Sequence, residues 1–179
     1  MAQTLYVLVY HSRPFAAHWS FWLPHNEGGR ELDTGDRIHV TGDRLNGFQY
    51  EYVQDYNVRE DERNPTPFAI GLVPGAVLGV ETGNAHDTVA GGALDGNIII
   101  NAFDKACREV QAPGPSLVKV NTTDSNKAAG PPRRTEVRDC QWWITQAVMH
   151  LIQADMLWPL DLSQGAETPA ARVKQLLQH

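Results

Sequence analysis

The chain has 179 residues, of which 42% are hydrophobic and 20% charged, as in soluble globular proteins that bury one substantial core. Its net charge of −6 argues against a nucleic acid or an anionic membrane as partner, since proteins that bind these usually carry a basic surface. No apolar run reaches the roughly 18 residues that span a membrane, and the N-terminus lacks the basic and apolar regions of a signal peptide. We therefore expect one domain over residues 1–179, located in the cytoplasm, with Cys107 and Cys140 as free thiols.

Apolar, β-branched and aromatic runs predict strands in the first half of the chain. In the second of these runs His18 and Trp22 face one way, while Trp19 and Phe21 face the other. A charged stretch that ends at Pro65 predicts a solvated loop. The strand runs are 5–10, 17–23, 37–41, 48–56 and two pieces interrupted by glycine, 68–73 and 76–80.

The second half predicts three helices, at 102–110, 139–157 and 169–177. The middle one has the clearest 3.6-residue apolar stripe, and Asp139 can cap its start. Segments 82–96 and 111–135 predict irregular structure, and we expect 57–66 and 111–135 to decide substrate choice. Together these elements predict an α+β fold, with an antiparallel sheet of about five strands packed against the cysteine-bearing helix.

Cys140 is the candidate nucleophile. It would occupy the first position of the predicted helix, where the partial positive charge of the helix N-terminus favours a thiolate. Backbone amides of the same turn could bind a developing oxyanion. Cys107, by contrast, falls on the apolar side of its short helix, so we expect it in the core.

A nucleophilic cysteine needs a base, and His18 is the leading candidate because an imidazole inside an aromatic strand requires a polar partner. His39 lies in the next predicted strand, and antiparallel pairing could bring the two rings together. Either histidine could instead be a satisfied core residue. The turn-rich surroundings of His11, His25 and His86 favour exposed positions for these three.

The order of the motifs His18-Trp-Ser-Phe-Trp-Leu, Arg37-Ile-His39-Val and Asp139-Cys140-Gln-Trp-Trp-Ile resembles that of circularly permuted papain-like cysteine enzymes, relatives of the NlpC-type peptidases. In these the histidine strand precedes the cysteine helix. The pattern is similar to the lecithin retinol acyltransferase-like branch and more similar to small fungal proteins of unassigned function, with a His-Trp strand and an Asn-Cys-x-x-Trp-Val helix start.

The resemblance covers residues 4–56 and 136–156. It implies Cys140 as nucleophile, His18 as base and His39 as the group that orients the base. Asp139 stands where the family often has Asn, which puts a carboxylate beside the nucleophile. The membrane anchors of the lecithin retinol acyltransferase branch are missing, which disfavours a phospholipid substrate.

We therefore expect a thiol-dependent hydrolase or an acyl or aminoacyl transferase that works through a thioester on a small-molecule or peptide substrate. Trp19 and Trp143 are candidates for lining the substrate groove. Trp142 and Trp143 cannot both face the core from the same helix, so one of them could instead simply cover the helix edge. No metal-ligand spacing or phosphate loop is present, so we expect no metal and no cofactor. Two rival hypotheses remain: a catalytically silent papain-like binding module, and a transfer-RNA-dependent aminoacyl transferase. The sequence does not indicate an oligomeric state.

Overall fold

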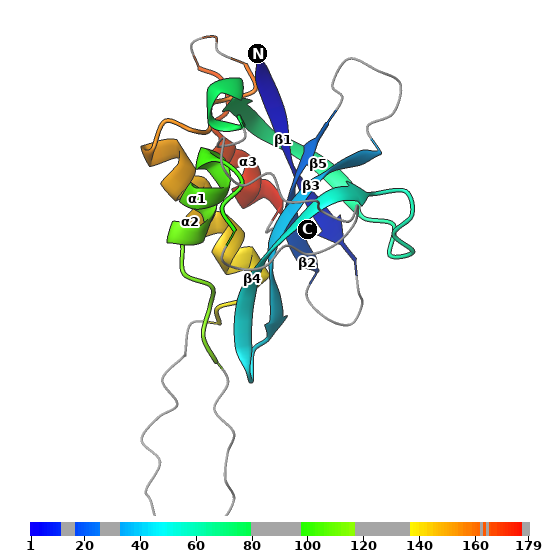
Figure 1. Ribbon diagram of the computed structural model, residues 1–179. Coiled ribbons are helices and arrows are strands. Elements are labelled where there is room, and N and C mark those ends of the chain that lie inside the picture. Colours follow the sequence, from blue (N-terminus) through cyan, green and yellow to red (C-terminus); the bar gives the residue numbers. More distant parts are fainter. Residues whose placement is uncertain are drawn as a thin grey trace, which may run out of the picture.

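The computed structural model describes residues 1–11, 17–25, 33–79, 98–116, 137–161, 163 and 165–176. These residues form a mixed α+β fold in which the helices gather on one side of a five-stranded antiparallel sheet (Figure 1). Among them, no helix has the length and apolar character needed to cross a membrane. His86, the predicted irregular segment 82–96 and most of 111–135 lie outside the described residues.

The sheet has the strand order β4-β3-β2-β1-β5, so neighbours along the chain mostly pair as hairpins. One predicted strand piece, 76–80, is wrong: the chain forms a short 3-10 helix, Gly75–Val77, in its place. A Cβ atom at Gly75 would lie 2.2 Å from the Met1 carbonyl oxygen, so the backbone at Gly75 packs directly against the N-terminal residue. The strands are β1 (Ala2–Tyr10), β2 (His18–Pro24), β3 (Thr34–Asp43), β4 (Gly47–Asn57) and β5 (Thr66–Pro74).

Three helices follow, α1 (Ala102–Glu109), α2 (Cys140–Gln153) and α3 (Pro169–Leu176). Helix α2 is four residues shorter at its C-terminal end than the apolar pattern predicts. Asp155 just beyond it has a φ of 56°, in the left-handed region that an α-helix cannot continue through. Leu157 nevertheless remains in the core, which is why the apolar pattern extends past the end of the helix.

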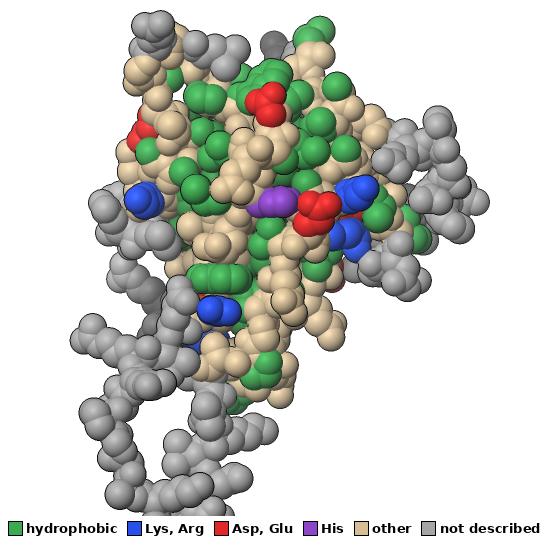
Figure 2. Space-filling view, turned by 90° about the vertical axis from the view of Figure 1, so that its left-hand side faces the viewer, with side chains coloured by type: hydrophobic (Ala, Val, Ile, Leu, Met, Phe, Trp, Pro, Cys, Tyr) green, Lys and Arg blue, Asp and Glu red, His purple; other side chains and the backbone are tan. Residues whose placement is uncertain are grey.

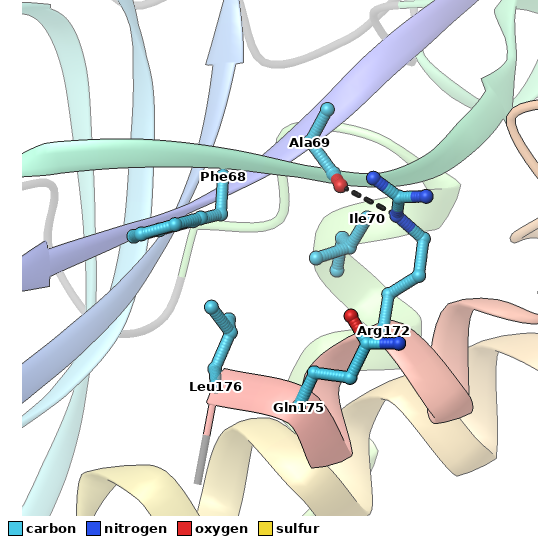
Figure 3. A pocket seen from close by; sticks show the side chains of 6 residues that line it. All are labelled: Phe68, Ala69, Ile70, Arg172, Gln175 and Leu176. Atoms are coloured by element: carbon cyan, nitrogen blue, oxygen red, sulfur yellow. Dashed lines mark hydrogen bonds between the residues drawn. The ribbon is translucent and has the colours of Figure 1, made fainter. Parts of the chain in front are cut away.

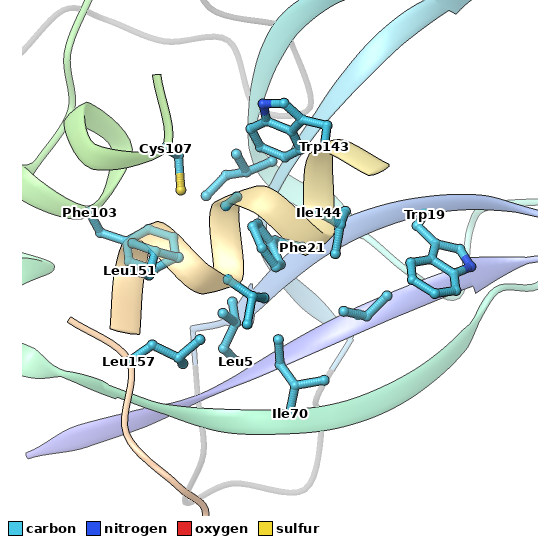
Figure 4. Close-up of a cluster of buried hydrophobic side chains, with 14 of the residues drawn as sticks. Leu5, Trp19, Phe21, Ile70, Phe103, Cys107, Trp143, Ile144, Leu151 and Leu157 are labelled. Carbon is cyan, nitrogen blue, oxygen red and sulfur yellow. The ribbon is translucent and has the colours of Figure 1, made fainter. Parts of the chain in front are cut away.

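The main core lies between α2 and the sheet (Figure 4). Trp19 and Phe21 of β2, which strand alternation places on the same face, project into it and pack with Trp143 and Ile144 of α2. A second, smaller cluster of Leu8, Tyr10 and Trp22 lies on the opposite face of the sheet. Figure 2 shows the helical side of the molecule, where hydrophobic side chains are interspersed with separate acidic and basic ones. The sheet therefore has two distinct faces, only one of which packs on the helices.

Helix α3 covers part of β5, which is an edge strand. Arg172 Nε donates a hydrogen bond of 2.9 Å to the Ala69 carbonyl oxygen (Figure 3). Further along the same edge, Leu72 forms a β-bridge with Trp158. Phe68, Ile70 and Leu176 line a shallow pocket between the strand and the helix. The backbone groups of β5 at Ala69 and Leu72 are thus paired, although β5 ends the sheet that the described residues form.

Candidate functional site

Cys140 is the first residue of α2, and Asp139 caps the helix as the sequence predicts. Asp139 Oδ1 accepts hydrogen bonds from the amides of Gln141 at 3.1 Å and Trp142 at 3.2 Å. Its other oxygen accepts from Arg44 Nη2 at 2.6 Å. Since the cap occupies the amides of Gln141 and Trp142, the amide of Cys140 itself, which contacts its own thiol, is the first-turn donor outside the cap.

The start of α2 lies against the start of β2. Gln141 Nε2 donates a 2.8 Å hydrogen bond to the carbonyl oxygen of Ala17, the residue before His18. The backbone amide of Trp19 hydrogen-bonds to the Cys140 thiol. The Cys140 thiol is thus bound to the backbone of the residue that follows His18, and Cys140 is only 7% exposed.

Burial raises the pKa of the Cys140 thiol to about 11, and the neighbouring charge of Asp139 acts in the same direction. The backbone amides of Trp19, Gln141 and Cys140 oppose this rise but do not cancel it. The thiolate expected from the helix N-terminus is therefore not the resting form. Loss of hydration outweighs the helix dipole here, because the sulfur is almost fully enclosed.

His18, His39 and Glu51 form a chain of polar contacts across three strands. His18 Nε2 lies 3.0 Å from His39 Nδ1, so the predicted approach of the two histidines is confirmed. His39 Nε2 lies 2.7 Å from Glu51 Oε2. Glu51 is directly opposite His39 in the pairing of β3 with β4. A carboxylate at that point favours a proton on His39 Nε2, which leaves Nδ1 to accept from His18 Nε2–H. The basic nitrogen of His18 is then Nδ1.

Both histidines are neutral near pH 7. Burial lowers the pKa of His18 to about 3, with the charges of His39, Arg37 and Arg63 acting in the same direction and Glu51 opposing them. Burial also lowers the pKa of His39, although the hydrogen bond to Glu51 resists the change. The pKa of Glu51 falls because of its hydrogen bond with His39. The resting site therefore holds a neutral imidazole and a neutral thiol.

Cys140 and His18 approach the first residues of β2 from different sides. The ring of His18 lies 5.5 Å from that of Tyr10, on the face away from the helices, whereas Trp19 and Cys140 belong to the main core. Within the described part of the chain, no hydrogen bond joins Cys140 to His18. The structure thus unites His18, His39 and Glu51, and places Cys140 on the other side of the first residues of β2, without a direct bond to them.

The two tryptophans predicted to line a substrate groove require correction. Trp19 is 2% exposed and Trp143 is fully buried, and the Trp143 indole donates to the Val110 carbonyl oxygen at 2.9 Å. Neither ring offers a surface to a substrate. Trp142 is the half-buried member of the pair in α2, with the Arg138 guanidinium 5.0 Å from its ring centroid.

The remaining cysteine and two of the histidines predicted to be exposed, His11 and His25, lie where the sequence predicts. Cys107 is fully buried in the main core, and burial raises its thiol pKa well above the usual value. His11 is exposed, and His25 contacts Asp36 at 2.8 Å near the surface. In the described ranges, no group of three or more histidine, cysteine, aspartate or glutamate side chains is arranged to hold a metal.

A family model matches residues 5–158, which include strands β2 to β5, most of β1, Cys140 and both site histidines. The chain belongs to this family, DUF6540, a family of unknown function. No curated protein and no solved structure matches the chain.

Proposed function

We propose that this protein is a thiol-dependent hydrolase or acyl transferase, with Cys140 as nucleophile, His18 as base and His39 as the residue that orients the base. The observation that carries the proposal is the His18–His39–Glu51 chain, whose first residue follows directly on the backbone that the capped start of the cysteine helix contacts. A histidine–histidine–carboxylate chain fixes the tautomer of its terminal imidazole, as a base needs. The order of strand and helix supports a permuted papain-like arrangement.

The neutral resting forms favour proton transfer during attack over a preformed ion pair. His18 Nδ1 would take the Cys140 proton as the sulfur bonds to a substrate carbonyl carbon, while the Cys140 amide donates to the developing oxyanion. Collapse would break the bond to the leaving group, which departs with the proton from His18 and leaves a thioester. Water or an amine would then release the acyl group, giving hydrolysis or transfer.

This mechanism requires the thiol and His18 Nδ1 to come within hydrogen-bond reach when substrate binds. Hydrogen bonds between catalytic groups are often loose without substrate and tighten in the complex. The rival proposal, a catalytically silent binding module, draws support from the raised thiol pKa and the missing bond between Cys140 and His18. Acylation chemistry separates the two proposals.

The test uses p-nitrophenyl acetate as an activated acyl donor. We expect a stoichiometric burst of p-nitrophenol and an acetyl thioester that peptide mass spectrometry assigns to Cys140. Cys140→Ser should abolish the thioester, and His18→Asn should slow acylation by about 10²- to 10⁴-fold, the usual contribution of a general base. Cys107→Ala is the matched control and should keep the burst. Added glycine methyl ester distinguishes transfer from hydrolysis by the amide that it forms.

Failure to acylate Cys140 in the folded protein, or equal slow labelling of both cysteines, would establish the silent module instead. Glu51→Gln tests the positioning chain separately. Since the charge of Glu51 raises the pKa of His18, the variant should move the midpoint of the acylation rate against pH to lower values. A side chain with a purely structural role would leave that midpoint unchanged.

A further inference from the structure

Arg37 is a buried cation on the same face of the sheet as His18 and His39. It lies in β3, two residues before His39, and only 8% of it is exposed. Its guanidinium carbon lies 5.2 Å from the centroid of the Tyr10 ring and 5.0 Å from that of Tyr56. The charge is therefore held between two aromatic rings in the smaller cluster of the fold.

Among the described residues Arg37 forms no ion pair, and its Nε is buried without a hydrogen-bond partner. The carboxylate of Glu51 interacts with the charge of Arg37 only through space. Arg63, which lies over the same Tyr10 ring at 4.4 Å, forms an ion pair with Asp61. Buried cations are almost always paired. Contact with aromatic rings offsets part of the cost of burying the charge, but it offers no acceptor in the guanidinium plane.

The environment of Arg37 connects it to the proposed reaction site. Its charge lowers the pKa of both His18 and His39, so the three groups lie within electrostatic reach. The edge of the cluster is open to solvent, since the side chain of Glu51 is 30% exposed and that of Arg63 53% exposed. An anion at Arg37 would therefore lie next to the imidazole that serves as base.

We infer that Arg37 binds a carboxylate group of the substrate on the side of the sheet that carries His18, so that the substrate is itself a carboxylic acid, such as a peptide with a free C-terminus. A guanidinium can hold a carboxylate through two parallel hydrogen bonds. Glu51 and Asp61 near the cluster disfavour a doubly charged phosphate. The substrate assignment rests on the proposed function, whereas anion binding by Arg37 does not.

The experiment titrates the wild-type chain with sodium acetate and, separately, with inorganic phosphate, each against chloride at constant ionic strength. The side-chain nitrogen resonances of His18 and His39 are followed by NMR. We expect acetate to shift these resonances to saturation in the millimolar range. Arg37→Gln should weaken acetate binding by about 10- to 100-fold, the contribution of hydrogen bonds to a charged group. Arg63→Gln is the matched control and should bind acetate nearly as well as wild type.

Arg37→Lys keeps the charge without the planar fork and should also bind acetate less tightly. A drift of the wild-type resonances equal to that in chloride would overturn the inference, whatever the variants do. Binding of phosphate in preference to acetate would overturn the carboxylate assignment, and loss of binding only in Arg63→Gln would overturn the role of Arg37. Repeating the titration on Cys140→Ser separates the two proposals, because anion binding should persist there even if Cys140 forms no thioester.

Discussion

Replacing Asp139 by asparagine should make Cys140 more reactive without unfolding α2. The carboxylate of Asp139 raises the pKa of the Cys140 thiol, and it also caps the helix through the amides of Gln141 and Trp142. Asparagine caps helices about as well as aspartate does. The substitution therefore removes the charge and keeps the local structure.

The size of the effect depends on Arg44, whose Nη2 lies 2.6 Å from Asp139 Oδ2 and neutralises part of its charge. A carboxylate so compensated should account for about one pKa unit of the rise in the thiol. One unit gives tenfold more thiolate, but a less basic thiolate is a weaker nucleophile by about threefold. The net gain in alkylation rate near pH 7 is then about three- to fourfold.

The assay follows iodoacetamide alkylation of Cys140 against pH by mass spectrometry, which gives both the rate and the thiol pKa. Arg44→Gln should slow alkylation, since it leaves the charge of Asp139 uncompensated. This variant is the control of opposite sign. An Asp139→Asn protein that is folded but is alkylated no faster than wild type would refute the electrostatic reasoning. A Cys140 pKa near 8.5 in the wild-type protein, the ordinary cysteine value, would refute it as well.

Three predictions concern stability. His18 stays neutral in the folded protein down to about pH 3, whereas an unfolded histidine binds a proton near pH 6.5. The free energy of unfolding should therefore fall as the pH drops from 6.5 toward 3. The contribution of His18 to this fall is at most about 1.4 kcal/mol per pH unit. His18→Gln should flatten that slope in urea unfolding, and an unchanged slope would contradict the assignment. Asp104 is fully buried and accepts hydrogen bonds from Tyr50 at 2.6 Å and Arg108 at 2.8 Å. Asp104→Asn should therefore lower the free energy of unfolding in urea by about 3 kcal/mol. The control Asp161→Asn, at an exposed position, should leave it unchanged. A side chain at Gly35 would lie 2.3 Å from the Leu23 carbonyl oxygen, so Gly35→Ala should cost about 1–3 kcal/mol in thermal unfolding; Gly79→Ala, whose nearest atom is 3.9 Å away, should unfold like wild type.

Much of the fold is predictable because its signals are local. Alternation in β2 separates Trp19 from His18, and the cap at Asp139 marks the first turn of α2. The end of α2 is less predictable, since Leu157 continues the apolar pattern in a segment that is no longer helical. Apolar periodicity reports burial, and burial persists where the chain leaves the helix.

The candidate site is predictable only in part because it depends on contacts between distant residues. His39 follows from the pairing of consecutive strands, but Glu51 requires the register of β3 with β4, which shifts between Gly35 and Arg37. The alternation of 48–56 places Glu51 on the polar side and is the only sequence signal for it. The raised pKa of Cys140 depends on the burial of its sulfur by other elements, which cannot be predicted from the sequence of the helix alone.

The covered edge of the sheet has a consequence for solubility. The match to the family model ends at residue 158, whereas α3 lies beyond it and supplies the hydrogen bond to Ala69. A chain truncated after Trp158 would keep the matched region but leave part of β5 uncovered beside the exposed ring of Phe68. Uncovered edge strands pair with the edges of neighbouring molecules. By covering β5, helix α3 therefore prevents self-association of the protein through this edge strand.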